Sequence, residues 1–298
     1  MQGVLVLGLV CTSNKVLRCL CCPIPLQFPQ SRSLRYTDDI ENKIALLPNE
    51  TICGIQNADK IYNGMQCAID EHAWTALLQY TKRNGERLIQ YFCGGVLISS
   101  RYVLTAAHCV KLNTHVRLGE WNTATENDCE FDDCADPILD VPIEQVIAHK
   151  DYDTADYRND IALIRLIQAV KINFVKPICL PITKDLLKKP YENWMMEVAG
   201  WGAVDDTTRI PVSNQEQCEG VYKNHNISIT DKQMCAGLSS GNACKGDSGG
   251  GLVGQDNTKG NWYLFGIVSF GSSPCAFYPT VYTRVTAYRH WILSNIQP

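Results

Sequence analysis

A histidine, an aspartate and a serine stand in this chain in surroundings suited to nucleophilic catalysis. His108 lies beside a cysteine, Asp160 begins an apolar run, and Ser248 sits between glycines. A hydroxyl attacks a carbonyl group when a base removes its proton, a carboxylate orients that base, and N–H donors stabilise the oxyanion. The N–H groups of Gly246 and Ser248 are the expected donors, since a Cβ at position 246 could obstruct them. We therefore predict acyl transfer to Ser248, with His108 as general base and Asp160 as its orienting carboxylate.

Each of these residues has a simpler interpretation when it is taken alone. A histidine beside a structural cysteine usually packs, an aspartate often ends a strand, and a glycine-rich segment is often an ordinary loop. The order histidine, aspartate, serine, with all three surroundings present in one chain, favours catalysis over these alternatives.

The remaining sequence indicates one large β-rich domain preceded by a leader. The chain has 298 residues, and two-barrel β folds can exceed about 200 residues as a single domain. Short β-prone runs at 96–98, 103–105 and 266–270 are separated by Gly, Asn and Asp clusters without helical patterns between them. A helix is expected at the carboxy terminus from four apolar residues at helical spacing: Tyr288, Trp291, Ile292 and Ile296.

Composition favours an extracellular protein that binds no nucleic acid. The chain has 27 basic and 31 acidic residues and a formal charge of -4, which provides no basic field for phosphates. Its 15 cysteines predict disulfides and therefore an oxidising compartment. Glycosylation sequons at Asn49 and Asn226 agree with export. The apolar run 4–10 lacks a preceding basic residue and is no clear signal peptide, and no run is long enough to span a bilayer.

Residues 61–298 resemble the chymotrypsin-like serine peptidases around all three candidate catalytic residues. Four segments are more narrowly similar to the clip-domain proteases of arthropods: 117–123, 134–137, 177–181 and 198–202. The resemblance implies an all-β fold of two six-stranded antiparallel β-barrels with a C-terminal helix. It also implies a secreted, extracellular zymogen of a proteolytic cascade in innate immunity, melanisation or Toll activation. The implied partners are a downstream zymogen or cytokine precursor as protein substrate, an upstream activating protease and a serpin-type inhibitor, with no nucleic acid and no membrane.

The resemblance also implies how the chain is divided and switched on. The expected parts are a leader with the remnant of a clip domain, a linker with the activation peptide, and the protease domain: 1–22, 23–60 and 61–298. Cleavage after Lys60 would free the α-amino group of Ile61. That ammonium would pair with the carboxylate of Asp247 and reorganise the loop ending at Ser248, which forms the oxyanion hole.

Cysteine connectivity cannot be deduced from spacing, so the expected disulfides are those that the resemblance implies. They are Cys53–Cys179, Cys93–Cys109, Cys129–Cys134, Cys218–Cys235 and Cys244–Cys275. The first would tether the leader after cleavage, and the second would hold the histidine loop. Cys67 and the four leader cysteines have no expected partner.

Two departures from the family concern substrate selection. Asn242 stands where trypsin-like relatives carry the aspartate that neutralises a basic substrate side chain, and Thr280 stands where they carry a glycine. The backbone of Ser269, Phe270 and Gly271 would align the substrate as an added strand, with Gly271 leaving its pocket wall open. We expect a shallow, uncharged pocket that prefers small or medium apolar residues.

Three further expectations concern a strand, a metal and an alternative function. Residues 203–217 are fewer than in the family, where this segment holds a strand of the second barrel, so we expect that strand to be absent. Glu120 and Glu130 bracket an acidic loop with oxygen ligands for a structural calcium ion, and a solvated loop is the simpler alternative. No other cofactor is expected. The alternative function is a catalytically weak or inactive protease homologue that acts as a cascade cofactor, although such homologues usually lack the serine found here.

Overall fold

The computed structural model describes most of the chain beyond residue 39. The described residues are 40, 42–56, 69, 71–81, 87–110, 114–125, 127–130, 133–171, 174–202, 208–237, 243, 246–256, 260–272 and 277–298. The chain divides into two units, 1–39 and 40–298, and all the described residues belong to the second unit. Among the described residues, no helix has the length and apolar character needed to cross a membrane.

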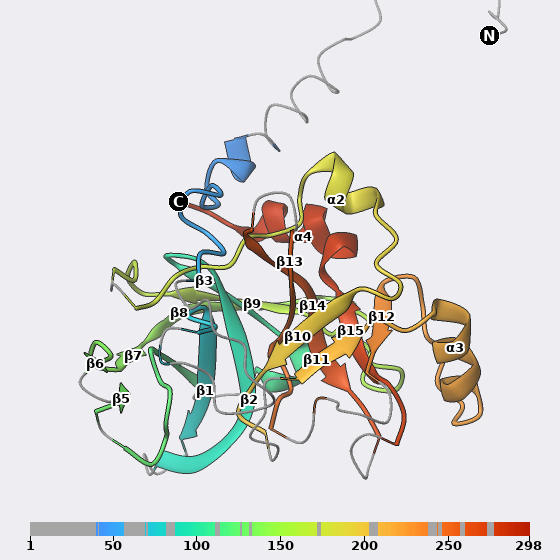
Figure 1. Ribbon diagram of the computed structural model, residues 1–298, viewed down its shortest axis with the longest axis horizontal. Coiled ribbons are helices and arrows are strands. Elements are labelled where there is room, and N and C mark those ends of the chain that lie inside the picture. The colour runs from blue at the N-terminus through green and yellow to red at the C-terminus, as the bar shows by residue number, and fades with distance from the viewer. Residues whose placement is uncertain are drawn as a thin grey trace, which may run out of the picture. The chain divides into compact units, whose positions relative to one another are not determined.

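One antiparallel sheet contains the strands from the first half of this unit, in the order β7-β4-β1-β2-β3-β9-β8 (Figure 1). Its strands are β1 (Thr75–Thr81), β2 (Arg87–Ser99), β3 (Tyr102–Thr105), β4 (Thr114–Leu118), β7 (Leu139–Val141), β8 (Ile143–Ala148) and β9 (Ala162–Leu166). A separate ribbon pairs β5 (Cys129–Glu130) with β6 (Asp133–Cys134). The sheet has seven strands instead of the expected six because Pro142, which has no N–H for the ladder, separates β7 from β8.

A second antiparallel sheet of six strands follows, in the order β11-β10-β13-β14-β15-β12. Its strands are β10 (Met195–Ala199), β11 (Thr208–Pro211), β12 (Gln233–Ala236), β13 (Gly251–Gln255), β14 (Trp262–Phe270) and β15 (Thr280–Arg284). Just after β11, Val212 forms an antiparallel bridge with Ala236, and the N–H of Ser213 donates to the carbonyl of Cys235 at 2.8 Å. These contacts connect the two outer strands, so the sheet closes on itself as the barrel fold requires.

The expected absence of a strand in the segment 203–217 is wrong. This segment contains β11, which pairs with β10 from Met195↔Pro211 to Val198↔Thr208. A strand of four residues is enough to cover the edge of β10, so the shorter segment leaves the pairing of that strand complete.

Short helices lie outside the sheets, among them α2 (Lys184–Lys188), α3 (Gln215–Lys223) and α4 (Arg289–Asn295). The predicted C-terminal helix is confirmed as α4, with narrower limits than the apolar pattern. Tyr288 belongs to a preceding 3₁₀ turn and Ile296 follows the last helical turn, yet both side chains are buried with Ile292. The apolar face therefore packs on the core as its spacing predicts.

Part of the segment expected to be a linker packs against the two sheets. Four apolar residues before Pro48 pack against the main core: Ile40, Ile44, Leu46 and Leu47. The Lys43 ammonium donates to the carbonyl oxygen of Ile296 at 2.7 Å, and the N–H of Trp262 donates to that of Gly54 at 2.9 Å. A disulfide joins Cys53 to Cys179. Residues 42–54 are therefore a structural part of this unit.

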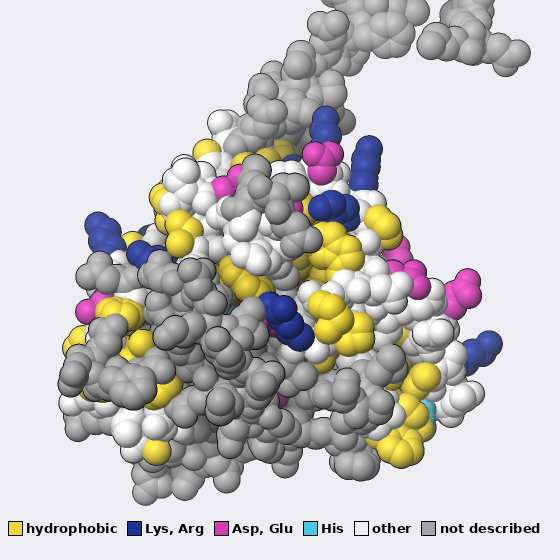
Figure 2. Space-filling model, in the orientation of Figure 1, with side chains coloured by type: hydrophobic (Ala, Val, Ile, Leu, Met, Phe, Trp, Pro, Cys, Tyr) yellow, Lys and Arg dark blue, Asp and Glu magenta, His cyan; other side chains and the backbone are white. Residues whose placement is uncertain are grey.

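The surface carries charges of both signs. Lys and Arg side chains are interspersed with Asp and Glu on the face seen in Figure 2. Asn49 and Asn226, the two sequon asparagines, are both exposed. The coloured side chains of this face, which are the described ones, form no field of one sign, in line with the formal charge of -4.

Candidate active site

The loop that carries His108 is fixed on both sides. It leaves β3 through a 3₁₀ turn, Ala107–Cys109, and a disulfide joins Cys109 to Cys93 on β2. The hydroxyl of Tyr80 donates to the carbonyl oxygen of Cys109 at 2.7 Å. A covalent staple and a buried hydrogen bond therefore hold the imidazole in place, and the staple further stabilises the fold by restricting the unfolded chain.

His108 and Asp160 form a tightly hydrogen-bonded pair. The Nδ1 atom of the imidazole lies 2.8 Å from Oδ2 of the carboxylate, and the backbone N–H of His108 donates to Oδ1 at 3.0 Å. Asp160 is fully buried, whereas 24% of the His108 side chain is exposed. The carboxylate therefore fixes the tautomer that leaves Nε2 as the proton acceptor on the exposed edge of the ring.

Two hydroxyl groups from the second sheet complete the surroundings of Asp160. The Ser269 hydroxyl, on β14, donates to Oδ2 at 2.6 Å, and the Thr283 hydroxyl, on β15, donates to the Asp160 carbonyl oxygen at 2.7 Å. The two sheets therefore meet at the aspartate. Three donors to the carboxylate compensate for the burial of its charge: the backbone N–H and the Nδ1–H of His108, and the Ser269 hydroxyl. Sequence reasoning assigned Ser269 only a backbone role and missed Thr283, since neither hydroxyl lies near Asp160 in the sequence.

Tyr157 is a further residue of the site that sequence reasoning missed. Its ring stands edge-on to His108 at 6.4 Å and is tilted against Phe270 at 4.9 Å between ring centroids. Its φ of 51° lies in the left-handed region, which is uncommon for an aromatic residue and directs the backbone into a sharp turn. An aromatic residue three positions before the candidate aspartate is the only sequence signal. The pair of rings forms a wall beside the imidazole.

The loop that carries Ser248 lies between the two sheets. The carbonyl oxygen of Ser248 accepts from the N–H of Gly94 on β2 at 2.7 Å, and the N–H of Gly249 donates to Val268 on β14 at 2.8 Å. Gly249 has a φ of 78°, and a Cβ there would lie 3.1 Å from the sulfur of Cys109. The residue after Ser248 is thus pressed against the turn that holds His108.

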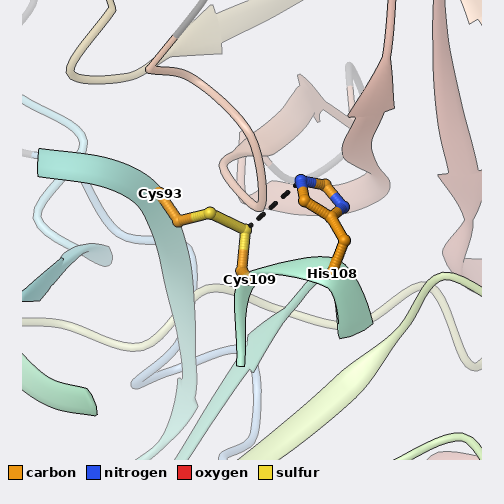
Figure 3. Close-up of side chains that lie close together, drawn as sticks. All are labelled: Cys93, His108 and Cys109. Carbon is orange, nitrogen blue, oxygen red and sulfur yellow. Dashed lines mark hydrogen bonds between the residues drawn. A yellow bond between two sulfur atoms is a disulfide. The ribbon is translucent and has the colours of Figure 1, made fainter. Parts of the chain in front are cut away.

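Figure 3 shows the imidazole of His108 beside the Cys93–Cys109 disulfide, with Nε2 at 3.6 Å from the sulfur of Cys109. Within the described part of the chain, no hydrogen bond joins this nitrogen to the Ser248 hydroxyl. Such bonds are often long or poorly aligned before a substrate is bound. The structure thus brings His108 and Asp160 into contact and places the Ser248 loop beside them, and the serine link stays a prediction.

Gly246 and Asp247 shape the turn before the serine. Gly246 has a φ of 112°, and a Cβ there would lie 2.7 Å from Cα of Gly202. The buried Asp247 carboxylate accepts from the N–H of Gly202 at 2.7 Å, and a side chain at Gly200 would collide with it. Only glycine fits at these positions. The expected partner of Asp247 at Ile61, with Lys60 before it, lies outside the described residues.

The described part of the predicted substrate pocket consists of residues on two facing strand ends. Thr280 is buried, its hydroxyl donates to the Ala243 carbonyl oxygen at 3.4 Å, and a Cβ on Gly271 would lie 3.2 Å from its Oγ1. The threonine side chain therefore lies close to the glycine at the position of the expected pocket. Asn242 lies outside the described residues.

Four of the five expected disulfides are present: Cys53–Cys179, Cys93–Cys109, Cys129–Cys134 and Cys218–Cys235. The expected Cys244–Cys275 pair, Cys67 and the leader cysteines lie outside the described residues. Cys53–Cys179 joins segments 126 residues apart, whereas the other three bridges close local loops with separations of 16, 5 and 17 residues.

In the acidic loop considered for calcium, several carboxylate oxygens are bonded within the protein, whereas Oε1 of Glu120 is buried without a hydrogen-bond partner among the described residues. The Asp128 carboxylate accepts from the N–H groups of Trp121 and Asn122 at 2.9 and 3.1 Å. The Glu120 carboxylate accepts from the Arg117 guanidinium at 3.0 Å, and its pKa is raised, mainly by burial. The side chain of Glu130 lies outside the described residues, so calcium binding here stays a prediction.

The chain is similar to known proteins over most of its length. Residues 61–292 match the family described as Trypsin. The chain is 46% identical over 93% of its length to the CLIP domain-containing serine protease HP8 of Bombyx mori, of which it covers 80%. It is 42% identical over 96% of its length to the serine protease ea of Drosophila melanogaster, of which it covers 79%.

The chain also has the fold of a solved clip serine protease. The Drosophila Grass clip serine protease of the Toll pathway superposes with a TM-score of 0.72 at 33% identity, over 85% of this chain and 77% of that one. The fold of two antiparallel barrels and the relatives together define a serine-type endopeptidase. The chain belongs to the trypsin family, and its relatives include arthropod clip-domain proteases.

Proposed function

We propose that this chain is the secreted zymogen of an extracellular proteolytic cascade in innate immunity, melanisation or Toll activation. Cleavage between Lys60 and Ile61 by an upstream protease would activate it, and a serpin-type inhibitor would end its action. The observation that carries the proposal is the His108–Asp160 pair, in which a fully buried carboxylate orients a partly exposed imidazole. The Grass protease of the Toll pathway, which is similar in fold and sequence, supports the cascade role.

The chemistry proposed is acyl transfer from a protein substrate. Ser248 Oγ attacks the peptide carbonyl carbon while His108 Nε2 takes the hydroxyl proton, and Asp160 stabilises the resulting imidazolium. The N–H groups of Gly246 and Ser248 stabilise the oxyanion. The C–N bond then breaks as His108 returns the proton to the leaving amine, and a water molecule, deprotonated by His108, hydrolyses the ester and frees Ser248.

Labelling with a fluorophosphonate tests this function directly. The full chain should not react before cleavage after Lys60 and should react at Ser248 afterwards, whereas the Ser248→Ala variant should stay unlabelled in both states. Cleaved chain that remains unlabelled would favour the inactive homologue that acts as a cascade cofactor. Labelling of both forms at equal rates would contradict the activation switch while keeping the peptidase.

The pocket should prefer small or medium apolar side chains in the substrate. Thr280 lies close to Gly271 and narrows the slot, and its buried position lets it move little. Asn242 would leave a buried basic side chain without a neutralising carboxylate, at a cost of several kcal/mol. Proteins, such as a downstream zymogen or a cytokine precursor, would therefore be cut after apolar residues.

A tetrapeptide panel with the activated enzyme measures this preference. Valine or alanine before the cleaved bond should give a higher kcat/KM than arginine by about 100-fold or more. Thr280→Gly should shift the optimum to larger side chains, and Asn242→Asp with Thr280→Gly should create cleavage after arginine. A clear preference of the unaltered enzyme for arginine would overturn the pocket assignment without affecting the proposed triad.

A further inference from the structure

A second histidine and carboxylate lie buried next to each other: His72 shortly before β1, and Glu197 on β10. Nε2 of His72 lies 3.8 Å from Oε2 of Glu197 on β10, and both side chains are less than 5% exposed. Neither ring nitrogen of His72, nor Oε2 of Glu197, has a hydrogen-bond partner among the described residues. Buried polar atoms are normally bonded, so three such atoms in one place require an explanation.

The spacing of Nε2 of His72 and Oε2 of Glu197 is closer to that of two ligands around one ion than to that of a hydrogen-bonded pair. A hydrogen-bonded pair would lie near 2.8 Å, as His108 and Asp160 do. Two ligands of a tetrahedral zinc ion lie roughly 3.3 Å apart when each bond is about 2.0 to 2.1 Å long. The 3.8 Å between His72 and Glu197 is therefore too long for a hydrogen bond and needs only a small contraction around a metal ion.

A third ligand lies beside this pair. One carboxylate oxygen of Glu71 lies within 4.8 Å of one ring nitrogen of His72 and of one carboxylate oxygen of Glu197. The Nε2 of Gln56 reaches Oε1 of Glu71 at 3.5 Å and helps to orient it. One imidazole and two carboxylates are a common ligand set for zinc, with a water molecule in the fourth position. Glu71 is only partly buried, so an ion could enter on its side.

The aromatic side chains around His72 keep its imidazole buried and therefore neutral, as a metal ligand must be. Its ring stands edge-on to Trp74 at 5.8 Å and to Trp262 at 6.1 Å. This burial lowers the pKa of His72 to about 4, so the imidazole is neutral at pH 7 and carries no proton that a metal must displace. One charge opposes a cation here: the Arg209 guanidinium donates to Oε1 of Glu197 at 2.7 Å.

We infer that Glu71, His72 and Glu197 bind a transition-metal ion of the zinc class. Nitrogen with carboxylate ligands favours zinc over calcium and magnesium, which prefer oxygen ligands alone. The ion would join the segment that precedes β1, in the first sheet, to β10, in the second sheet. The site is independent of the proposed catalysis, since none of its residues touches His108, Asp160 or Ser248 in any described contact. Its role would be structural, as a clamp between the two sheets.

Zinc titration of the full chain, after removal of metals with a chelator, tests this site. Calorimetry should show one Zn²⁺ bound per chain, with a rise in Tm that Ca²⁺ does not reproduce. His72→Phe fills the space between the tryptophans without a ligand atom and should weaken Zn²⁺ binding by at least about 10-fold. Glu197→Gln should weaken it as well, and Arg209→Gln should strengthen it because it removes a competing charge.

The matched control is His115→Phe, since His115 is an exposed histidine on β4. This variant should bind Zn²⁺ as the unaltered chain does. The proposal is overturned if the unaltered chain binds no Zn²⁺ at millimolar concentration. It is also overturned if His72→Phe and His115→Phe bind it equally, because binding would then belong to surface histidines. A His72→Phe protein with the far-UV circular dichroism of the unaltered chain shows that lost binding is not lost folding.

Discussion

The described residues include two pairs of a histidine and a carboxylate, and only one of the pairs is joined by a hydrogen bond. In the pair His108–Asp160 the two atoms are 2.8 Å apart, and the carboxylate also accepts from a backbone N–H and from Ser269. In the pair His72–Glu197 the atoms are 3.8 Å apart and unbonded among the described residues. An unmade buried hydrogen bond costs about 1–3 kcal/mol, so only the first pair is stable as a network of protein groups alone.

Exposure separates the two pairs further. The His108 side chain is 24% exposed and that of His72 is 3% exposed. A substrate can therefore reach the first imidazole, whereas only an ion or a proton can reach the second. The same two residue types thus form an orienting pair when the imidazole and the carboxylate bond to each other. They form the metal site that we infer when the facing atoms, here Nε2 of His72 and Oε2 of Glu197, are left without a hydrogen bond.

The largest expected difference between the pairs is in catalysis. Asp160→Asn keeps the shape of the side chain but allows the wrong tautomer of His108, so kcat of the activated enzyme should fall by about 10⁴-fold. Glu197→Gln, the matched change in the other pair, should leave kcat within about 2-fold. Rates on a chromogenic peptide, with active sites counted by fluorophosphonate, measure both. An equal loss in the two variants would mean that the pairs are not distinct.

The second expected difference is in stability against acid, with metal removed by a chelator. Burial lowers the pKa of His72 from 6.5 to about 4, so between these values the unfolded chain binds more protons than the folded chain. The free energy of unfolding should therefore fall by roughly 2 to 3 kcal/mol from pH 7 to pH 4.5. The pKa of Glu197 is raised, mainly by burial, which favours the folded chain at low pH and opposes this effect.

Comparison with His72→Phe isolates the histidine, because Glu71, Glu197 and Arg209 are present in both proteins. Urea unfolding at the two pH values should show a smaller loss for His72→Phe than for the unaltered chain. Parallel losses would show that His72 is solvated or bonded, which would contradict the contrast with His108.

The sequence predicts what depends on local pattern. The surroundings of His108, Asp160 and Ser248 indicated the chemistry, and the C-terminal helix followed from apolar spacing. The family resemblance supplied the two barrels and four disulfides that are present. These features depend on residues close together in the sequence or on motifs shared with relatives.

Contacts between distant segments could not be predicted in the same way. Thr283 and Ser269 reach Asp160 only because β14 and β15 pack against the other sheet, and their hydroxyls have no signature in the sequence. The packing of residues 42–54 was missed because a run without periodicity can still be held by single contacts, such as Lys43 with Ile296. The strand β11 was missed because chain length alone does not show how few residues an edge strand needs.

The smallest expected effect concerns the hydroxyl donors around Asp160. Two variants measure the contributions of Ser269 and Thr283 separately. Ser269→Ala removes one of the donors to the carboxylate, so the negative charge is less well held and kcat should fall by about 10-fold with KM little changed. Thr283→Val keeps the volume of the side chain but removes the donor to the Asp160 carbonyl oxygen. This oxygen does not contact the imidazole of His108 directly. It should lower Tm by a few degrees and leave kcat within about 2-fold. Equal losses of kcat would show that both hydroxyls act only by holding the loop of Asp160 in place. A loss confined to Ser269→Ala, with a changed pH profile of kcat, assigns Ser269 as a positioning residue that acts through the carboxylate.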